Sequence, residues 1–283
     1  MTNIRMALTE AMQHLKVESP EPRLDAEILL MHSLGKNRAY LYAHPDKLLS
    51  DDQLKGYLHL ISQRARGIPI AYIIGHREFW SLCLKVNPHT LIPRHETERL
   101  VELVIELLPD TSETHILDLG TGSGAVALAV ATERPQWQIT ACDISIEALK
   151  IARENATNLG ITNIQFFHSD WFESLPPKSY HAILSNPPYI AKDDPHLAQG
   201  DVRFEPLSAL ASGQDGLADL QYIIRNSYNY LLPGGMLLME HGFDQKIPIN
   251  TIMKQIGYNN VHCWQDLNGV DRVSGGWRDN VAK

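Results

Sequence analysis

A motif of four residues, Asn186, Pro187, Pro188 and Tyr189, begins at the last residue of a predicted β-strand, Tyr180–Asn186. A planar –NH2 group is a poor nucleophile because its lone pair is delocalised, and the ~18–20 kcal/mol barrier to rotation about a peptide C–N bond gauges that delocalisation. The Asn186 Oδ1 atom and the Pro187 carbonyl can accept both N–H bonds of such a group and turn its lone pair toward a methyl donor. Pro188 has no competing N–H, and Tyr189 can pack against the planar group.

This motif predicts catalysis by positioning. In-line methyl transfer needs the reacting atoms at ~3–3.5 Å, and it needs neither a metal nor a covalent enzyme intermediate. Two prolines alone would be typical of a simple turn. The position after a strand, downstream of a glycine cluster, favours the chemical interpretation, but it does not distinguish adenine, cytosine or glutamine as the acceptor. We predict Asn186, Pro187 and Tyr189 to be catalytic, and the substrate to contact Asn186, Pro187, Pro188 and Tyr189.

Three glycines, at positions 120, 122 and 124, lie between a predicted strand, His115–Leu119, and a predicted helix, Ala125–Thr132. Glycine permits a tight turn and lets a ligand approach the backbone closely. With Ala125, the same spacing also fits the dinucleotide fingerprint, and Asp143 could hold ribose hydroxyls in either case. A glycine cluster without a ligand is the third interpretation, which the three spaced glycines and Asp143 disfavour.

The charge of the ligand separates the first two interpretations. Asp118 directly precedes the glycines, where a carboxylate would repel a pyrophosphate but would attract the sulfonium and ammonium of S-adenosyl-L-methionine. We therefore expect S-adenosyl-L-methionine and not NAD as the cofactor. Asp170 and Trp171 follow the predicted strand Ile164–His168, where an adenine would lie, although Trp171 could also be a core residue. The predicted cofactor site comprises Asp118, Gly120, Thr121, Gly122, Ser123, Gly124, Asp143, Asp170, Trp171 and Asn186.

Strands and helices alternate from about residue 93 to the end of the chain. Besides the elements above, we predict strands at Gln138–Asp143 and Gly235–Glu240 and a helix at Ile146–Asn155. Such alternation is typical of an α/β fold with a doubly wound parallel sheet, which binds its ligand at the carboxyl ends of the strands.

Residues 1–67 are predicted to form a small helical domain, in which no residue has chemical character. Apolar residues recur at helical spacing from residue 4 to 15, and the apolar run Leu24–Leu34 ends at Gly35, a plausible helix cap. A third helix begins at Ser50, with Gln53 completing a capping box. Residues 68–92, rich in β-branched and aromatic residues, are predicted to be a β-hairpin that links this domain to residues 93–283.

Composition excludes several classes of protein. The 283 residues are 44% hydrophobic with a net charge of −8, and residues 1–70 are about neutral. A protein that binds nucleic-acid phosphates would normally show a basic face. No segment approaches the length of a membrane span or the apolar run of a signal peptide. The three cysteines are widely spaced and odd in number, which is typical of free thiols in a reducing compartment. We expect a cytoplasmic monomer that binds neither membrane nor nucleic acid directly.

The sequence resembles the HemK/PrmC family of release-factor glutamine methyltransferases over nearly its whole length. The matching segments are Arg23–Glu27, Pro69–Gly75, Glu78–Trp80, Leu91–Arg94, Glu96–Glu98, Asp118–Gly124, Asn186–Tyr189, Arg203–Pro206 and Asp271–Val273. The resemblance implies an N-terminal helical domain that docks the substrate, a β-hairpin and a class I methyltransferase domain. It implies transfer of a methyl group from S-adenosyl-L-methionine to N5 of the glutamine in the Gly-Gly-Gln motif of class 1 peptide chain release factors.

One departure from the family pattern is His95, where proline usually stands between the arginine and the acid. The resemblance implies that this region shapes the active-site wall. The run from His95 to Glu98 matches no zinc motif, and the start of a helix with acids in its first turn explains it better. We expect no metal.

Two other functions remain open from the residues. A DNA adenine-N6 methyltransferase uses the same Asn-Pro-Pro-Tyr logic, but the acidic charge and the lack of a basic recognition domain disfavour it. A non-enzymatic protein that binds the methyl donor would not need an intact Asn186–Tyr189 motif.

Overall fold

The computed structural model describes residues 2–111 and 114–280. The chain separates into two compact units, one comprising Met1–His76 with Ala198–Phe204 and the other Arg77–Leu197 with Glu205–Lys283. The sequence did not predict that the short segment Ala198–Phe204 packs with the first unit. In the described part of the chain, no helix is long and apolar enough to cross a membrane.

The first unit is helical, as predicted. Its helices are α1 (Ile4–Leu15), α2 (Pro22–Leu34), α3 (Arg38–Ala43), α4 (Asp51–Arg64) and α5 (Ile70–Ile74). Gly35 ends α2 with a left-handed φ of 60°, and the side chains and backbones of Ser50 and Gln53 form the predicted capping box. The predicted end of α2 and the predicted start of α4 are therefore confirmed. The apolar sides of α1, α2 and α4 share one core.

Two ion pairs, one of them made by the buried Arg64, attach Ala198–Phe204 to this helical unit. The Arg64 side chain is 4% exposed and donates to Asp25 and Asp201, at 2.7 and 2.8 Å. Arg203 pairs with Glu18 at 2.9 Å. Because an unpaired buried charge is costly, Arg64 needs both carboxylates. The segment thus belongs to the helical unit, although none of its residues is buried.

The predicted hairpin is shorter than residues 68–92, and the assignment of its first part was wrong. Ile70–Ile74 forms helix α5, which ends at Gly75 with a φ of 80°. Ile70, Ile73 and Ile74 pack against the helical core, so their spacing is that of a helical face. The hairpin itself consists of β1 (His76–Phe79) and β2 (Leu82–Lys85).

The second unit contains a seven-stranded sheet of order β5-β4-β3-β6-β7-β9-β8. Its strands are β3 (His115–Leu119), β4 (Gln138–Asp143), β5 (Ile164–His168), β6 (Tyr180–Ser185), β7 (Leu231–Glu240), β8 (Asn259–Gln265) and β9 (Asp271–Trp277). The first five strands in that order are parallel, and β9 and β8 are antiparallel. This confirms the α/β fold, with two strands that the sequence did not predict: β9, which is antiparallel to both of its neighbours, and the edge strand β8.

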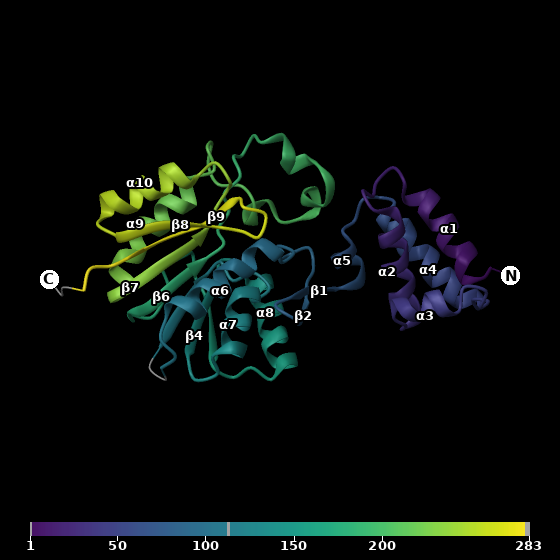
Figure 1. Cartoon of the computed structure of the whole chain (residues 1–283), viewed down its shortest axis with the longest axis horizontal. Helices are drawn as coiled ribbons and strands as arrows, with labels where there is room; N and C mark the ends of the chain where they lie inside the picture. Colours follow the sequence, from purple (N-terminus) through teal and green to yellow (C-terminus); the bar gives the residue numbers. More distant parts are fainter. Residues whose placement is uncertain (1, 112–113, 281–283) are drawn as a thin grey trace. The chain divides into compact units, whose positions relative to one another are not determined.

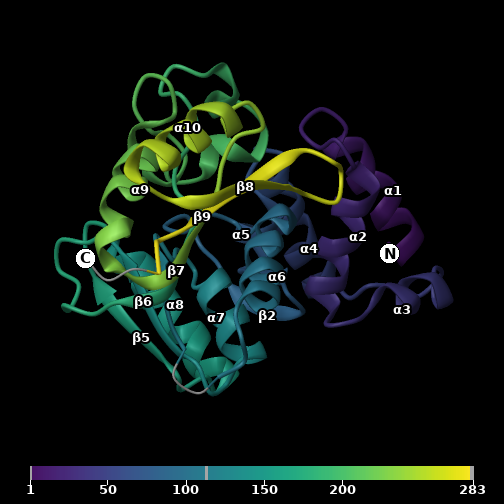
Figure 2. The same ribbon diagram turned by 60° about the vertical axis from the view of Figure 1, so that its left-hand side comes forward.

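Helices cover both faces of the sheet (Figure 1). One face packs α6 (Glu98–Leu107), α7 (Ala125–Glu133) and α8 (Ile146–Leu159), and the other packs α9 (Ala218–Tyr230) and α10 (Lys246–Ile256). The same two layers are visible in Figure 2. The segment from His95 to Glu98 begins a helix, as predicted: a 3-10 turn, His95–Thr97, leads into α6.

The topology brings two predicted loops together. The chain builds the sheet from β3 toward β5 and then crosses back to β6, so the order of strands reverses between β3 and β6. Ligands in open α/β sheets bind at such a switch point, beyond the carboxyl ends of the strands. The glycine loop follows β3 and Asn186 follows β6, and the Ser185 hydroxyl donates to the Leu119 carbonyl at 2.8 Å, which joins the ends of these strands.

Candidate active site

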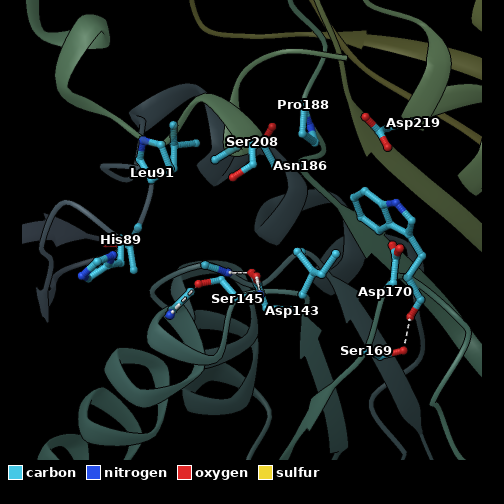
Figure 3. Close-up of a pocket in the computed structure, with 18 of the residues that line it drawn as sticks. His89, Leu91, Asp143, Ser145, Ser169, Asp170, Asn186, Pro188, Ser208 and Asp219 are labelled. Atoms are coloured by element: carbon cyan, nitrogen blue, oxygen red, sulfur yellow. Dashed lines mark hydrogen bonds between the residues drawn. The ribbon is translucent and has the colours of Figure 1, made fainter. Parts of the chain in front are cut away.

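A cavity of about 490 Å³ lies at the carboxyl edge of the sheet. Its size suits a small organic molecule. In Figure 3, Asp143 and Ser145 lie on one side of it, Asn186 and Pro188 on the opposite side, and Asp170 and Asp219 at one end. Residues outside the predicted cofactor and substrate sites also contribute to its walls: Pro88, His89, Thr90, Leu91, Pro206, Ser208, Ala209 and Asp219.

The glycine loop adopts the conformation that its sequence requires. Gly120, Gly122 and Gly124 have φ values of 71°, 56° and 87°, in the left-handed region that side chains disfavour. A Cβ atom on Gly120 would lie 3.4 Å from the Trp171 ring, and one on Gly124 would lie 2.9 Å from Leu128. Any side chain at these two positions would therefore crowd the cavity wall or the following helix.

Asp143 holds the glycine loop in place and also lines the cavity. Its Oδ2 accepts the Gly122 N–H and its Oδ1 accepts the Ser145 N–H, both at 2.8 Å. Burial raises the pKa of Asp143, and these backbone donors oppose the shift. Each carboxylate oxygen retains a second lone pair, so Asp143 can still accept hydrogen bonds from a ligand.

Asp118 lies outside the large cavity, against a second cavity of about 50 Å³ whose lining includes Arg94, Thr97 and Asn186. The side chain is buried, with Thr121 donating to it at 2.6 Å, and burial raises the pKa of Asp118 to about 7. A bound cation would favour the ionised form. Thr121 and Ser123 line this smaller cavity too.

Trp171 and Asp170 line the large cavity beyond the end of β5. The Trp171 backbone has a φ of 44°, and its carbonyl accepts the Ser169 hydroxyl at 2.9 Å. The Trp171 ring is only partly buried. Of the two interpretations left open, the structure therefore favours a cavity wall over a core residue.

Asn186 lines both cavities. Its Nδ2 donates to the Thr97 Oγ1 atom at 3.0 Å. Pro187 is buried and Pro188 lines the large cavity. Tyr189 lines neither cavity; its hydroxyl donates to Glu240 at 3.1 Å, and burial raises the pKa of Tyr189. Packing of its ring against a planar acceptor stays a prediction.

The sequence analysis missed Thr97 and Glu240. The Thr97 hydroxyl donates to Glu240 Oε2 at 2.6 Å, and Glu240 is 1% exposed. A signal for Glu240 was present, because it ends an apolar strand at the same edge as Asp143 and Asn186. Thr97 lies within the Glu96–Glu98 segment of the family resemblance, but its residue type and its place before an amphipathic helix gave it no chemical role.

The Arg94 segment contributes to the wall of the smaller cavity, whereas His95 lines neither cavity. Arg94 pairs with the buried carboxylate of Glu205, which also accepts the Ile92 N–H at 2.9 Å. The His95 side chain is 68% exposed, so this departure from the family pattern lies outside both cavities. Within the described residues, no group of three or more His, Cys, Asp or Glu side chains could hold a metal ion.

Comparison with known proteins accounts for both units. The family model of the PrmC N-terminal domain matches residues 6–75, and that of the methyltransferase small domain matches residues 95–201. A release factor glutamine methyltransferase of Vibrio cholerae is 50% identical over 96% of this chain and 95% of its own length. One from Coxiella burnetii is 49% identical over 96% of this chain and 98% of its own.

Among solved structures, a T. thermophilus 16S rRNA methyltransferase in complex with AdoMet and guanosine is similar in fold. Its TM-score is 0.53 at 16% identity, over 72% of this chain and 49% of that one. The two family models together span most of the helical unit, the glycine loop and the Asn186 loop. The chain belongs to the family of release factor glutamine methyltransferases.

Proposed function

We propose that this enzyme transfers a methyl group from S-adenosyl-L-methionine to N5 of the glutamine in the Gly-Gly-Gln motif of class 1 release factors. The observation that carries this proposal is the position of Asn186. It follows β6 at the switch point of the sheet and lines both the large cavity and the smaller one beside Asp118. An acceptor held there by Asn186 would meet a donor held by the loop after β3.

The donor loop has the chemistry that S-adenosyl-L-methionine needs. Asp143 offers carboxylate oxygens for the ribose hydroxyls, and Trp171 offers a ring face for the adenine. Asp118 lines the smaller cavity and would face the positive charge of the amino-acid end or the sulfonium. The aromatic wall and the two carboxylates fit this ligand better than they fit a dinucleotide, whose pyrophosphate Asp118 would repel.

Transfer of tritiated methyl groups tests the proposal. Purified enzyme and labelled S-adenosyl-L-methionine are incubated with a release factor in one reaction and with duplex DNA in another. We expect label in the release factor and none in the DNA. Label in the DNA alone would show a DNA methyltransferase, and binding of the cofactor with no transfer to either would leave a non-enzymatic binding protein.

Asp143 should contribute strongly to cofactor affinity. We expect Asp143→Ala to weaken S-adenosyl-L-methionine binding by roughly 2–4 kcal/mol, because two ribose hydroxyls lose a charged acceptor. Asp143→Asn is the matched control, since it keeps the shape and one acceptor oxygen and should lose less. Calorimetry on the folded variants measures both affinities, and an unchanged affinity in Asp143→Ala would remove this residue from the ribose site.

We propose further that residues 1–67 form a helical domain that docks the release factor, and that residues 68–92 link this domain to the catalytic part at 93–283. We also propose that the enzyme works as a monomer in the cytoplasm and binds neither nucleic acid nor membrane. The helical unit has a cavity of about 420 Å³ on its own surface, whose lining includes Leu8, Met12, Arg23 and Tyr42. A wall that combines apolar, aromatic and charged side chains is typical of sites that recognise protein surfaces.

Deleting residues 1–67 should separate docking from chemistry. The deletion also removes Arg64, the partner of Asp201, so a change in activity alone would be ambiguous. We therefore compare an intact release factor with a short peptide that carries the target glutamine. We expect the deletion to raise KM for the intact factor far more than for the peptide and to spare cofactor binding. An equal change with both substrates would leave the unit with a stabilising role only.

A further inference from the structure

We propose that Thr97 and Glu240 are positioning residues that fix the side-chain amide of Asn186, so that its Oδ1 atom faces the acceptor nitrogen. This inference rests on the proposed function and deepens it, because it names the residues that make the site select an –NH2 group. Neither residue lines the large cavity, whereas Thr97 lines the smaller one together with Asn186. Both act through Asn186.

Three hydrogen bonds join these residues in one chain. Asn186 Nδ2 donates to Thr97 Oγ1 at 3.0 Å, Thr97 Oγ1 donates to Glu240 Oε2 at 2.6 Å, and Tyr189 donates to Glu240 Oε1 at 3.1 Å. Thr97 is 5% exposed and Glu240 is 1% exposed. Polar groups buried to this extent are costly unless they are paired, so each bond constrains the next.

The donor and acceptor in each hydrogen bond of this series follow from which groups carry a proton to donate. Thr97 gives its single hydroxyl proton to Glu240 Oε2, which accepts it as a carboxylate oxygen. The Thr97 oxygen is then an acceptor toward Asn186 and can pair only with the amide N–H. If the amide were turned over, Asn186 Oδ1 would face Thr97 Oγ1 with no proton between them. The buried carboxylate therefore directs the Asn186 oxygen away from Thr97.

Burial, hydrogen bonds and nearby charges act in opposite directions on the pKa of Glu240. Burial raises the pKa of Glu240, and the nearby Glu96 carboxylate acts in the same direction. The hydroxyls of Thr97 and Tyr189 and the positive charge of Arg272 lower it. Arg272 belongs to the Asp271–Val273 segment of the family resemblance. The proposal gives Arg272 a role, because its positive charge favours the ionised form of Glu240, which accepts the hydrogen bond from Thr97.

Thr97→Val and Thr97→Ser form a pair of variants that tests the proposal. Valine keeps the shape of threonine but removes the hydroxyl, whereas serine keeps the hydroxyl and removes a methyl group. Thr140→Val is the control for removing a buried threonine hydroxyl elsewhere, since Thr140 lies within β4 and is 4% exposed. Full-length enzyme is used throughout, with intact release factor as substrate.

We expect Thr97→Val to lower kcat by about 10- to 100-fold, because loss of one oriented hydrogen bond and small displacements of a reacting group have effects of this order. The affinity for S-adenosyl-L-methionine should stay within about twofold of the wild type. Thr97→Ser should restore most of kcat, and Thr140→Val should leave it unchanged.

A second readout reports on the amide itself. The wild type should bind a release factor with the target glutamine more tightly than one with glutamate in its place, because Oδ1 repels a carboxylate. In Thr97→Val the amide can turn over, so the ratio of the two Kd values should move toward one. A wild-type kcat and an unchanged ratio in folded Thr97→Val would overturn the proposal. Absence of methyl transfer by the wild type would instead refute the proposed function.

Discussion

The Asn186→Ala enzyme should transfer methyl groups about 10²–10³-fold more slowly than the wild type, as expected for the loss of one group that stabilises a transition state. The amide oxygen accepts a hydrogen bond from the substrate nitrogen, and this bond matters most as the nitrogen rehybridises to attack the methyl group. Asn186 also donates to Thr97, so alanine leaves a buried hydroxyl oxygen without its N–H donor. Single-turnover rates with intact release factor measure the effect.

Cofactor affinity distinguishes this loss from general damage to the fold. Asn186 follows β6, whereas Asp143, the predicted ribose ligand, follows β4, so the affinity for S-adenosyl-L-methionine should fall much less than the rate in Asn186→Ala. Asn268→Ala, at an exposed position between β8 and β9, is the control for removing an asparagine side chain. Near-normal turnover in Asn186→Ala would mean that the motif is only a turn.

A release factor with glutamate in place of the target glutamine should accept no methyl group. The carboxylate would face two acceptors, Asn186 Oδ1 and the Pro187 carbonyl, and it has no nitrogen to methylate. Sites built around specific polar pairing reject analogues by factors of ~10⁴–10⁵. Tritium incorporation into the glutamate variant, compared with the unaltered factor, measures this selectivity.

Asparagine in place of the target glutamine should be methylated at least ~10²-fold more slowly. Asparagine keeps the amide, but its shorter side chain holds the nitrogen ~1.5 Å farther from the methyl group of the donor, and a displacement of even ~1 Å can lower a rate by this factor. This variant is the matched control for the glutamate one, since it retains the –NH2 group. Efficient labelling of the asparagine variant would show that the site does not fix the nitrogen. Labelling of the glutamate variant would place the methyl group on another residue.

The sequence predicted the parts of the fold that depend on local signals. Gly35 and the pair Ser50 and Gln53 mark helix ends through their own backbone and side-chain bonds, and the structure contains both. The strands β3, β4 and β5 have the predicted bounds, since each is a run of apolar residues between turn signals. The predicted β6 extended one residue too far, and β7 begins four residues before the predicted start.

Features that depend on distant contacts were not predictable in this way. The helix Ile70–Ile74 has aromatic and β-branched residues that favour strands, and packing against the helical core determines its conformation. The attachment of Ala198–Phe204 to the helical unit depends on Arg64 meeting Asp201, 137 residues away. Thr97 and Glu240 are likewise 143 residues apart, and only the folded sheet places them beside Asn186.

Mass spectrometry of the methylated release factor tests the central claim most directly. The factor is incubated with enzyme and S-adenosyl-L-methionine, digested, and fragmented to locate the added methyl group. We predict a single methyl group on the side-chain amide of the Gly-Gly-Gln glutamine, absent when the enzyme is Asn186→Ala at the same short reaction time. A methyl group on any other residue, or an unmodified factor in the presence of active, cofactor-bound enzyme, would contradict the account.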